Sequence, residues 1–197
     1  MKKYNIKIKA NPVFPFYLQH RMDDVDLKKW EESRGRIIER KDLNQDDIVK
    51  AEYHSYKNLE GDYYIPANHI MGALINAGKL VKAKVGNATK SMTNVVAGMF
   101  YVKSLNGNHD QIPIGPWDDI LKVSAVNQNI KARVMTYRPK WKDWSAEFEL
   151  IVDNDTVTDQ TIKTVVEYAG AYVGIGSWRP EKKGQYGRYV IEEFKKI

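Results

Sequence analysis

The chain has 197 residues, of which 43% are hydrophobic and 28% charged, as expected for one globular domain with a hydrophobic core. It contains no cysteine, which excludes disulfides, thiol catalysis and zinc sites built on cysteine. The formal net charge of +6 either favours a polyanionic partner such as nucleic acid or serves solubility alone.

The first ten residues, MKKYNIKIKA, alternate polar and apolar side chains and do not resemble a signal peptide. No stretch approaches the roughly 20 consecutive apolar residues that a membrane-spanning helix needs. We therefore expect a cytoplasmic protein with no membrane partner.

The predicted elements begin with a strand over 4–10, in which apolar residues alternate with lysine and asparagine. A helix is expected over 24–40 and an extended segment over 48–57. The segment YYIPANHIMGALINAGKLV predicts a helix that starts after Pro66 with Asn68 as its N-cap. Its apolar residues recur at helical spacing: Ile70, Ala73, Leu74, Ala77 and Val81.

The middle of the chain has the weakest pattern. Residues 82–94 are basic, polar and aperiodic, which predicts a mobile excursion from the core. Residues 95–105 resemble a strand, and the glycine- and proline-containing segment that follows resembles a loop.

The last third of the chain has the clearest pattern. Residues 131–137 and 144–152 are predicted to form a hairpin joined by RPKWKD. Thr158 is expected to cap a helix whose first turn carries Asp159, and a final strand is expected to begin at Tyr189. The buried stripe of that helix is expected to comprise Ile162, Val165, Val166, Ala169 and Val173.

Without its insertions, the chain follows the order strand, helix, strand, strand, helix, strand, which is typical of the ferredoxin-like or RRM-like fold. The predicted fold class is α+β, with an antiparallel sheet, helices on one face and a flexible insertion. We expect a single domain over 1–197, with the insertion around 82–110.

No motif indicates catalysis or a cofactor. The histidines are scattered, without metal-ligand spacing: His20, His54, His69 and His109. Asp23, Asp24 and Asp26 could hold Mg²⁺, but acids near a helix start usually serve capping and the helix dipole. We therefore assign no catalytic residue, no metal ligand and no cofactor.

The segment GIGSWRPEKKGQYGRYVIEEF, residues 174–194, is the strongest candidate for a binding site. Its glycines leave backbone N–H groups open to phosphate oxygens, its cations supply charge-assisted contacts, and its aromatic rings can stack on unpaired bases. The alternative is a helix C-cap at Gly174 or Gly176 followed by a solvated loop. The candidate residues are Gly174, Gly176, Trp178, Arg179, Lys182, Lys183, Gly184, Gly187 and Arg188.

A second basic and aromatic cluster, YRPKWKDW, spans 137–144. Arg138 and Lys140 are candidate phosphate contacts, while Trp141 either stacks on a base or shields the turn. The lysines of the predicted excursion, Lys82, Lys84 and Lys90, are a third candidate, with a solvated loop as the alternative.

Two segments resemble the RAMP superfamily, the repeat-associated proteins of CRISPR effector complexes. IPANHIMGAL is similar to the superfamily's "iPgSslkGalr" segment, and GIGSWRPEKKGQYGRY is similar to its C-terminal glycine-rich loop. The size of the chain resembles that of the backbone subunits that cover a guide RNA. The resemblance implies a ferredoxin-like core, a thumb-like insertion and RNA contacts from Asn68 and His69 as well as from the loop.

The chain also departs from the superfamily pattern. Asn68 replaces a small hydroxyl residue, and Ile75 stands where a basic residue is usual. These departures fit a divergent phage or mobile-element member equally well.

The expected function is non-enzymatic binding of single-stranded RNA or DNA, in a filament of copies of this chain or beside other effector-complex subunits. One alternative is a RAMP-type endoribonuclease that uses His20 or His54 as a general base. Another alternative is a phage structural or assembly protein whose basic loop contacts another subunit.

Overall fold

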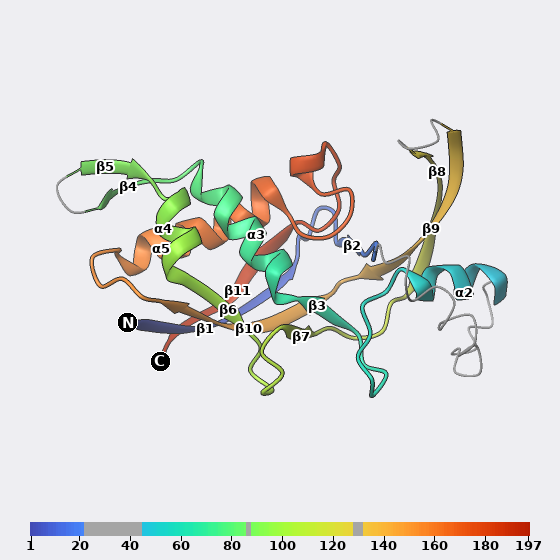
Figure 1. Ribbon diagram of the computed structural model, residues 1–197, viewed down its shortest axis with the longest axis horizontal. Helices are drawn as coiled ribbons and strands as arrows, with labels where there is room; N and C mark the ends of the chain where they lie inside the picture. The colour runs from blue at the N-terminus through green and yellow to red at the C-terminus, as the bar shows by residue number, and fades with distance from the viewer. Residues whose placement is uncertain (22–44, 86–87, 128–131) are drawn as a thin grey trace.

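A computed structural model describes residues 1–21, 45–85, 88–127 and 132–197 (Figure 1). Its central sheet has the strand order β11 (Tyr189–Lys196), β1 (Lys2–Ala10), β10 (Ser145–Val152) and β6 (Phe100–Lys103). Every neighbouring pair in this sheet is antiparallel. The fold class is therefore α+β with antiparallel sheets, in agreement with the sequence at this level.

The predicted first strand is confirmed as β1. Tyr4, Ile6 and Ile8 are completely buried and pair in register with Leu150, Phe148 and Ala146 of β10. The intervening lysines lie on the opposite face, because successive side chains of a strand point to opposite sides. The hydrophobic core therefore lies on one side of the sheet only.

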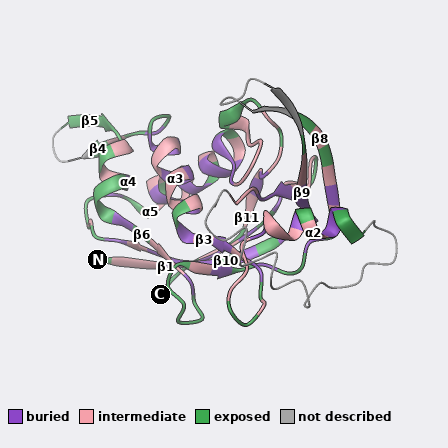
Figure 2. Ribbon diagram, turned by 45° about the vertical axis from the view of Figure 1, so that its right-hand side comes forward, coloured by how far each residue is buried: buried purple, intermediate pink, exposed green. Residues whose placement is uncertain are grey.

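Helices α3 (Ala67–Gly78) and α5 (Asp159–Tyr168) cover that side (Figure 1), and their sheet-facing sides are buried (Figure 2). The predicted α5 is confirmed: the Thr158 hydroxyl accepts a hydrogen bond from the Thr161 N–H at 3.2 Å, and the whole predicted stripe is buried. A π-helical turn, η2 (Ala169–Val173), continues α5 and ends at Gly174.

Helix α3 is confirmed as an element, but its ends differ from the prediction. Pro66 occupies the N-cap position and no side chain caps the helix, so Asn68 lies inside the first turn. The helix ends at Gly78, and Val81 is buried beyond its end. Because Pro66 disfavours helical geometry at Ile65, the helix begins after the proline without a polar cap.

A second antiparallel sheet, with the order β2 (Phe16–Leu18), β9 (Ala132–Lys142) and β8 (Asp119–Asn127), extends to the right in Figure 1. The predicted hairpin of 131–152 is wrong, because β9 pairs with β8 and β2 while β10 lies in the central sheet. The predicted connection RPKWKD is also wrong, because all of it except Asp143 belongs to β9. At Asp143 the backbone turns with a φ of 50° and separates the two strands.

Three segments expected to be extended or mobile differ from their prediction. Residues 48–57 lie largely in α2 (Gln45–Tyr53), which packs against β9. Within 82–94, β4 (Lys82–Val85) pairs antiparallel with β5 (Ala88–Ser91), so the predicted excursion contains regular secondary structure. The predicted strand 95–105 is α4 (Thr93–Met99) followed by β6.

A small sheet pairs β3 (Tyr64–Pro66) with β7 (Gln111–Pro113) ahead of α3. The helix expected over 24–40, together with Asp23, Asp24 and Asp26, lies outside the described residues. Within the described ranges, no helix is long and apolar enough to cross a bilayer.

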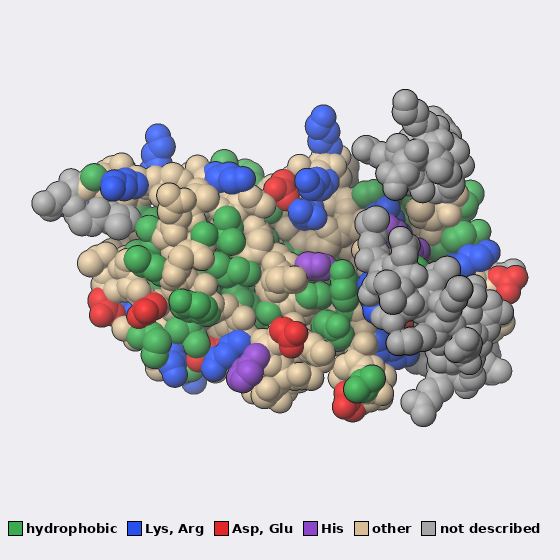
Figure 3. Space-filling view, in the orientation of Figure 1, with side chains coloured by type: hydrophobic (Ala, Val, Ile, Leu, Met, Phe, Trp, Pro, Cys, Tyr) green, Lys and Arg blue, Asp and Glu red, His purple; other side chains and the backbone are tan. Residues whose placement is uncertain are grey.

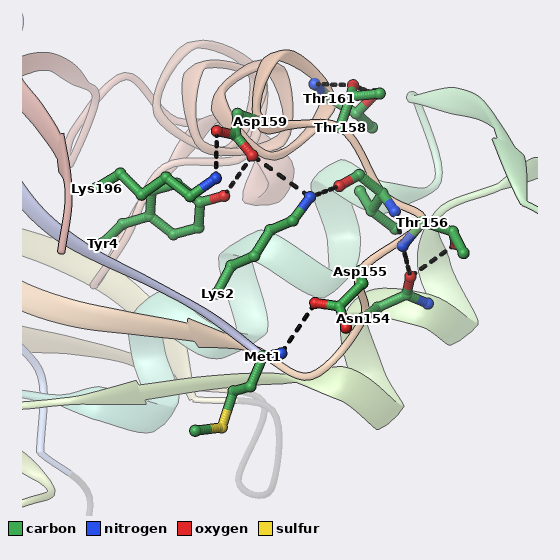
Figure 4. A network of polar contacts seen from close by, with 11 residues as sticks. Met1, Lys2, Tyr4, Asn154, Asp155, Thr156, Thr158, Asp159, Thr161 and Lys196 are labelled. Atoms are coloured by element: carbon green, nitrogen blue, oxygen red, sulfur yellow. Dashed lines mark hydrogen bonds and ion pairs between the residues drawn. The ribbon is translucent and has the colours of Figure 1, made fainter.

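A polar network joins the first and last strands of the chain, β1 and β11, to α5 (Figure 4). The Asp159 carboxylate accepts hydrogen bonds from the Tyr4 hydroxyl and the Lys196 ammonium, each at 2.8 Å, and lies 3.4 Å from the Lys2 ammonium. These contacts fix α5 over β1 and β11, and α5 leads through η2 into the glycine-rich loop.

Candidate nucleic-acid interface

The glycine-rich loop, residues 174–188, connects η2 to β11 and lies beside α3 and β2 (Figure 1). Its backbone is held by the protein itself. The N–H of Gly174 donates to Ala169 O at 2.7 Å, that of Gly184 to Arg179 O at 3.0 Å, and that of Gly187 to Phe16 O at 2.9 Å. These amides are therefore not available to phosphate oxygens.

Packing within the protein also explains why each of these loop positions is glycine. A Cβ at Gly176 would overlap the carbonyl oxygen of Leu18, and one at Gly184 would overlap that of Trp178. A Cβ at Gly187 would overlap the carbonyl oxygen of Ile175, and one at Gly174 would lie 2.6 Å from Pro180 Cδ. The expectation that these glycines let a ligand approach is therefore corrected: they let the loop pack against its own chain.

Arg138 is 6% exposed and belongs to the support of the loop. Its guanidinium lies 4.5 Å from the centre of the Trp178 ring and donates to the Ser177 hydroxyl. Arg138 is therefore not the free phosphate contact that the sequence suggested. Its guanidinium also covers one face of the Trp178 ring.

Two other candidates of the 137–144 cluster, Trp141 and Lys140, are also engaged. Trp141 is 2% exposed and its indole N–H donates to Gly115 O at 2.6 Å, so it offers no stacking surface and the stacking interpretation is wrong. Lys140 pairs with Asp119 and lies over the Phe16 ring at 5.2 Å. Arg138, Lys140 and Trp141 therefore have structural roles on β9, the middle strand of the second sheet.

The cations of the loop fall into two groups. Arg179 is paired with Glu181, with its Nη2 2.7 Å from the carboxylate, and the Arg188 guanidinium donates to Ala171 O at the end of η2. Lys182 and Lys183 are exposed, and among the described residues neither has an ion-pair partner. These two lysines are therefore the cations of the loop that are open to a polyanion.

A cleft of about 150 Å³ separates α3 from the loop. It brings together residues that the resemblance had singled out in two distant segments: Asn68 and His69 of α3, and Gly176 and Arg179 of the loop. The rest of its lining was not predicted and comprises Gly72, Ala73, Asn76 and Ile175. A sequence signal for part of this lining is the four-residue spacing of Asn68, Gly72 and Asn76, which places all three on one helix face.

His69 forms one wall of this cleft. Its ring meets Tyr56 edge-on with the centroids 5.2 Å apart, and its Nδ1 is buried without a hydrogen-bond partner in the part of the chain described. Burial and then the nearby Arg179 lower the pKa of the imidazole, so His69 is neutral at neutral pH.

Lysine and arginine side chains stand along the upper edge of the molecule, over the glycine-rich loop and over the β4–β5 hairpin (Figure 3). Lys82, Lys84 and Lys90 of the hairpin are exposed. The open face of the central sheet differs, because Lys7 and Lys9 there share Glu192, and Lys103 pairs with Glu149. The helix-bearing side therefore carries exposed lysines for which no ion pair is found among the described residues: Lys82, Lys84, Lys90, Lys182 and Lys183.

His20 and His54, the candidate catalytic bases, lie in contact with their ring centroids 4.4 Å apart. Burial, followed by His54 and Arg138, lowers the pKa of His20 to about 4. Neither histidine lines the cleft. In the described ranges, no three His, Asp or Glu side chains form a group that could hold a metal ion.

No protein-family model matches the sequence, and no curated protein matches it. Among solved structures, the fold is similar to a chain in the cryo-electron microscopy structure of the type III-B Cmr-beta complex bound to cognate target RNA. That alignment covers 100% of this chain and 60% of the other, with 11% identity and a TM-score of 0.49. The chain thus spans about three fifths of the length of that solved chain.

Proposed function

We propose that this protein binds single-stranded nucleic acid, and RNA in particular, on its helix-bearing side without chemical turnover. The observation that carries the proposal is the cleft between α3 and the loop, where Asn68 and His69 meet Gly176 and Arg179. Lys182 and Lys183, exposed on the same loop, supply the cationic rim.

Side-chain charge, rather than glycine amides, holds the phosphates in this proposal. Exposed lysines attract a polyanion and release its counterions on binding, so affinity falls as salt rises. Lys82, Lys84 and Lys90 extend the positive surface along the same edge of the molecule (Figure 3). The strand therefore follows this edge from the loop towards the β4–β5 hairpin.

We also propose that the core is ferredoxin-like and that the protein is a RAMP-type subunit. The order of elements β1, α3, β6, β10, α5, β11, with the sheet order β11-β1-β10-β6, supports the fold. The similarity of IPANHIMGAL and of the glycine-rich loop to the superfamily supports the subunit role. Copies of the chain then line up along the bound strand, alone or with other effector-complex subunits.

Purification without nuclease treatment, followed by sequencing of any nucleic acid that copurifies, tests the proposal directly. Fluorescence anisotropy with a labelled oligoribonucleotide across a salt titration then tests the mechanism. We expect RNA to copurify and the affinity to fall steeply with salt. Absence of both copurifying nucleic acid and measurable binding at low salt would overturn the proposal.

RNA cleavage is a second candidate function, favoured by the contact between His20 and His54. Because neither histidine lines the cleft, we expect intact RNA after prolonged incubation with the protein. Cleavage products that disappear in the His54→Ala variant would establish the enzymatic alternative instead.

A further inference from the structure

Gly72 differs from the other glycines near the cleft. It lies in the interior of α3, where glycine weakens a helix relative to alanine. A Cβ at Gly72 would meet no atom of the described residues within 4 Å, whereas one at Gly78 would lie 3.0 Å from the backbone of Met92 and Thr93. Packing within the chain therefore explains Gly78 but gives no reason for the missing side chain at Gly72.

The space at Gly72 opens into the cleft and is flanked by two carboxamides. Asn68 lies one turn before it and Asn76 one turn after it, and all three line the cleft. The Asn76 Oδ1 accepts a hydrogen bond from Lys79 at 2.7 Å, which leaves its NH₂ group as a donor. Asn68 is exposed and can both donate and accept hydrogen bonds.

The cleft is close to electrically neutral. Among the described residues that line it, the one cation is Arg179, which is compensated by Glu181 and also donates to Gly176 O at 3.0 Å. The pKa of His69 is lowered, so its ring adds no charge. A phosphate gains little here compared with the rim at Lys182 and Lys183, whereas an uncharged hydrogen-bonding group suits the carboxamides.

The lining of the cleft favours a sugar over a base. Its volume of about 150 Å³ has room for a five-membered sugar ring with its hydroxyl groups. Apart from His69, whose ring already packs against Tyr56, no aromatic side chain of the described ranges lines it. A base placed here would lack the stacking surface that single-strand binders provide.

We infer that the cleft is a ribose subsite, in which the bare helix surface at Gly72 receives the sugar ring and Asn68 and Asn76 hydrogen-bond its 2′-hydroxyl. This inference rests on the proposed binding of single strands and adds the basis on which RNA is told from DNA. The 2′-hydroxyl is both donor and acceptor, and it is the group that DNA lacks.

Binding of three labelled strands of one sequence, RNA, DNA and 2′-O-methyl RNA, tests the inference with the full chain. We expect the protein to bind RNA about tenfold more tightly than the other two, the effect of one or two neutral hydrogen bonds. Because the sugar of DNA lacks the hydroxyl that engages Asn68 and Asn76, DNA leaves this cleft empty in the proposed mode. The Gly72→Ala variant should therefore bind RNA about as weakly as DNA, with its affinity for DNA unchanged.

The control is Gly98→Ala in α4, since a Cβ there also meets nothing within 4 Å but Gly98 does not line the cleft. Both variants should melt at or above the temperature of the parent protein, because alanine favours a helix. Equal binding of RNA and DNA by the parent, or an equal loss of both with Gly72→Ala, would overturn the ribose subsite and leave the proposed function standing. Failure of every strand to bind would overturn both.

Discussion

The guanidinium of Arg138 lies 4.5 Å from the ring centre of Trp178, and it also donates a hydrogen bond to Ser177. These contacts join β9 of the second sheet to the glycine-rich loop that leaves the helical layer. The loop is therefore a fixed part of the tertiary structure, and it presents its exposed lysines from a defined position.

The coupling between these two side chains is measurable. In a double-mutant cycle with Arg138→Met and Trp178→Leu, we expect a coupling free energy of about 1–2 kcal/mol, because the cation is largely removed from water. Urea unfolding of the four proteins gives this value. A coupling free energy indistinguishable from zero would mean that the stacking does not stabilise the loop.

Gly187→Ala should destabilise the folded protein. Gly187 has a φ of 69°, and a Cβ there would overlap Ile175 O. The left-handed backbone conformation alone costs a non-glycine residue about 1–3 kcal/mol, and the steric overlap adds to that loss. Urea unfolding beside Gly98→Ala, whose added methyl group meets open space, provides the comparison. Equal stability of the two variants would contradict the packing role of Gly187.

Replacement of Lys182 and Lys183 together by glutamine should weaken binding to every single strand alike. The logarithmic salt slope should become shallower by about 1.4, since each phosphate contact on a single strand contributes about 0.7. The reference is the double variant Lys7→Gln and Lys9→Gln, which removes the same charge from the open sheet face, where Glu192 pairs with both lysines. Equal weakening by the two double variants would show that net charge, rather than the loop, governs binding.

Asp159→Asn should lower stability at neutral pH but not in strong acid. The hydrogen bonds from Lys196 and then Tyr4 lower the pKa of Asp159 to about 2, below its ordinary value of 3.8. The stabilisation is therefore fully present above about pH 4 and is lost as the pH falls towards 2. Because the side chain is 46% exposed, we expect a difference of at most about 1 kcal/mol at pH 7.

Thermal unfolding of the parent and Asp159→Asn between pH 2 and pH 7 measures this difference. Asp153→Asn, at an exposed carboxylate just after β10, serves as the control and should follow the parent at every pH. A gap between the Asp159→Asn variant and the parent that persists at pH 2 would contradict the ionic origin of the stabilisation.

The elements predicted correctly are those whose signals are local. Helix α5 has its cap at Thr158 and an apolar stripe at helical spacing, and strand β1 alternates strictly, so each pattern specifies its own buried face. The segment RPKWKD was wrongly predicted to be a connection because its proline and charges are typical of a turn. Pairing with β8 on one side and β2 on the other keeps it extended.

By itself, the sequence determined that the chain is a basic α+β protein, and it pointed to the two segments that form the candidate interface. Only the tertiary structure decided what each glycine does. The loop glycines make room for the protein's own carbonyl groups, and Gly72 leaves room beside α3. The physical reason is that a glycine in the sequence shows only that a Cβ is absent. Whether a Cβ would clash there depends on atoms of residues that are far away in the chain.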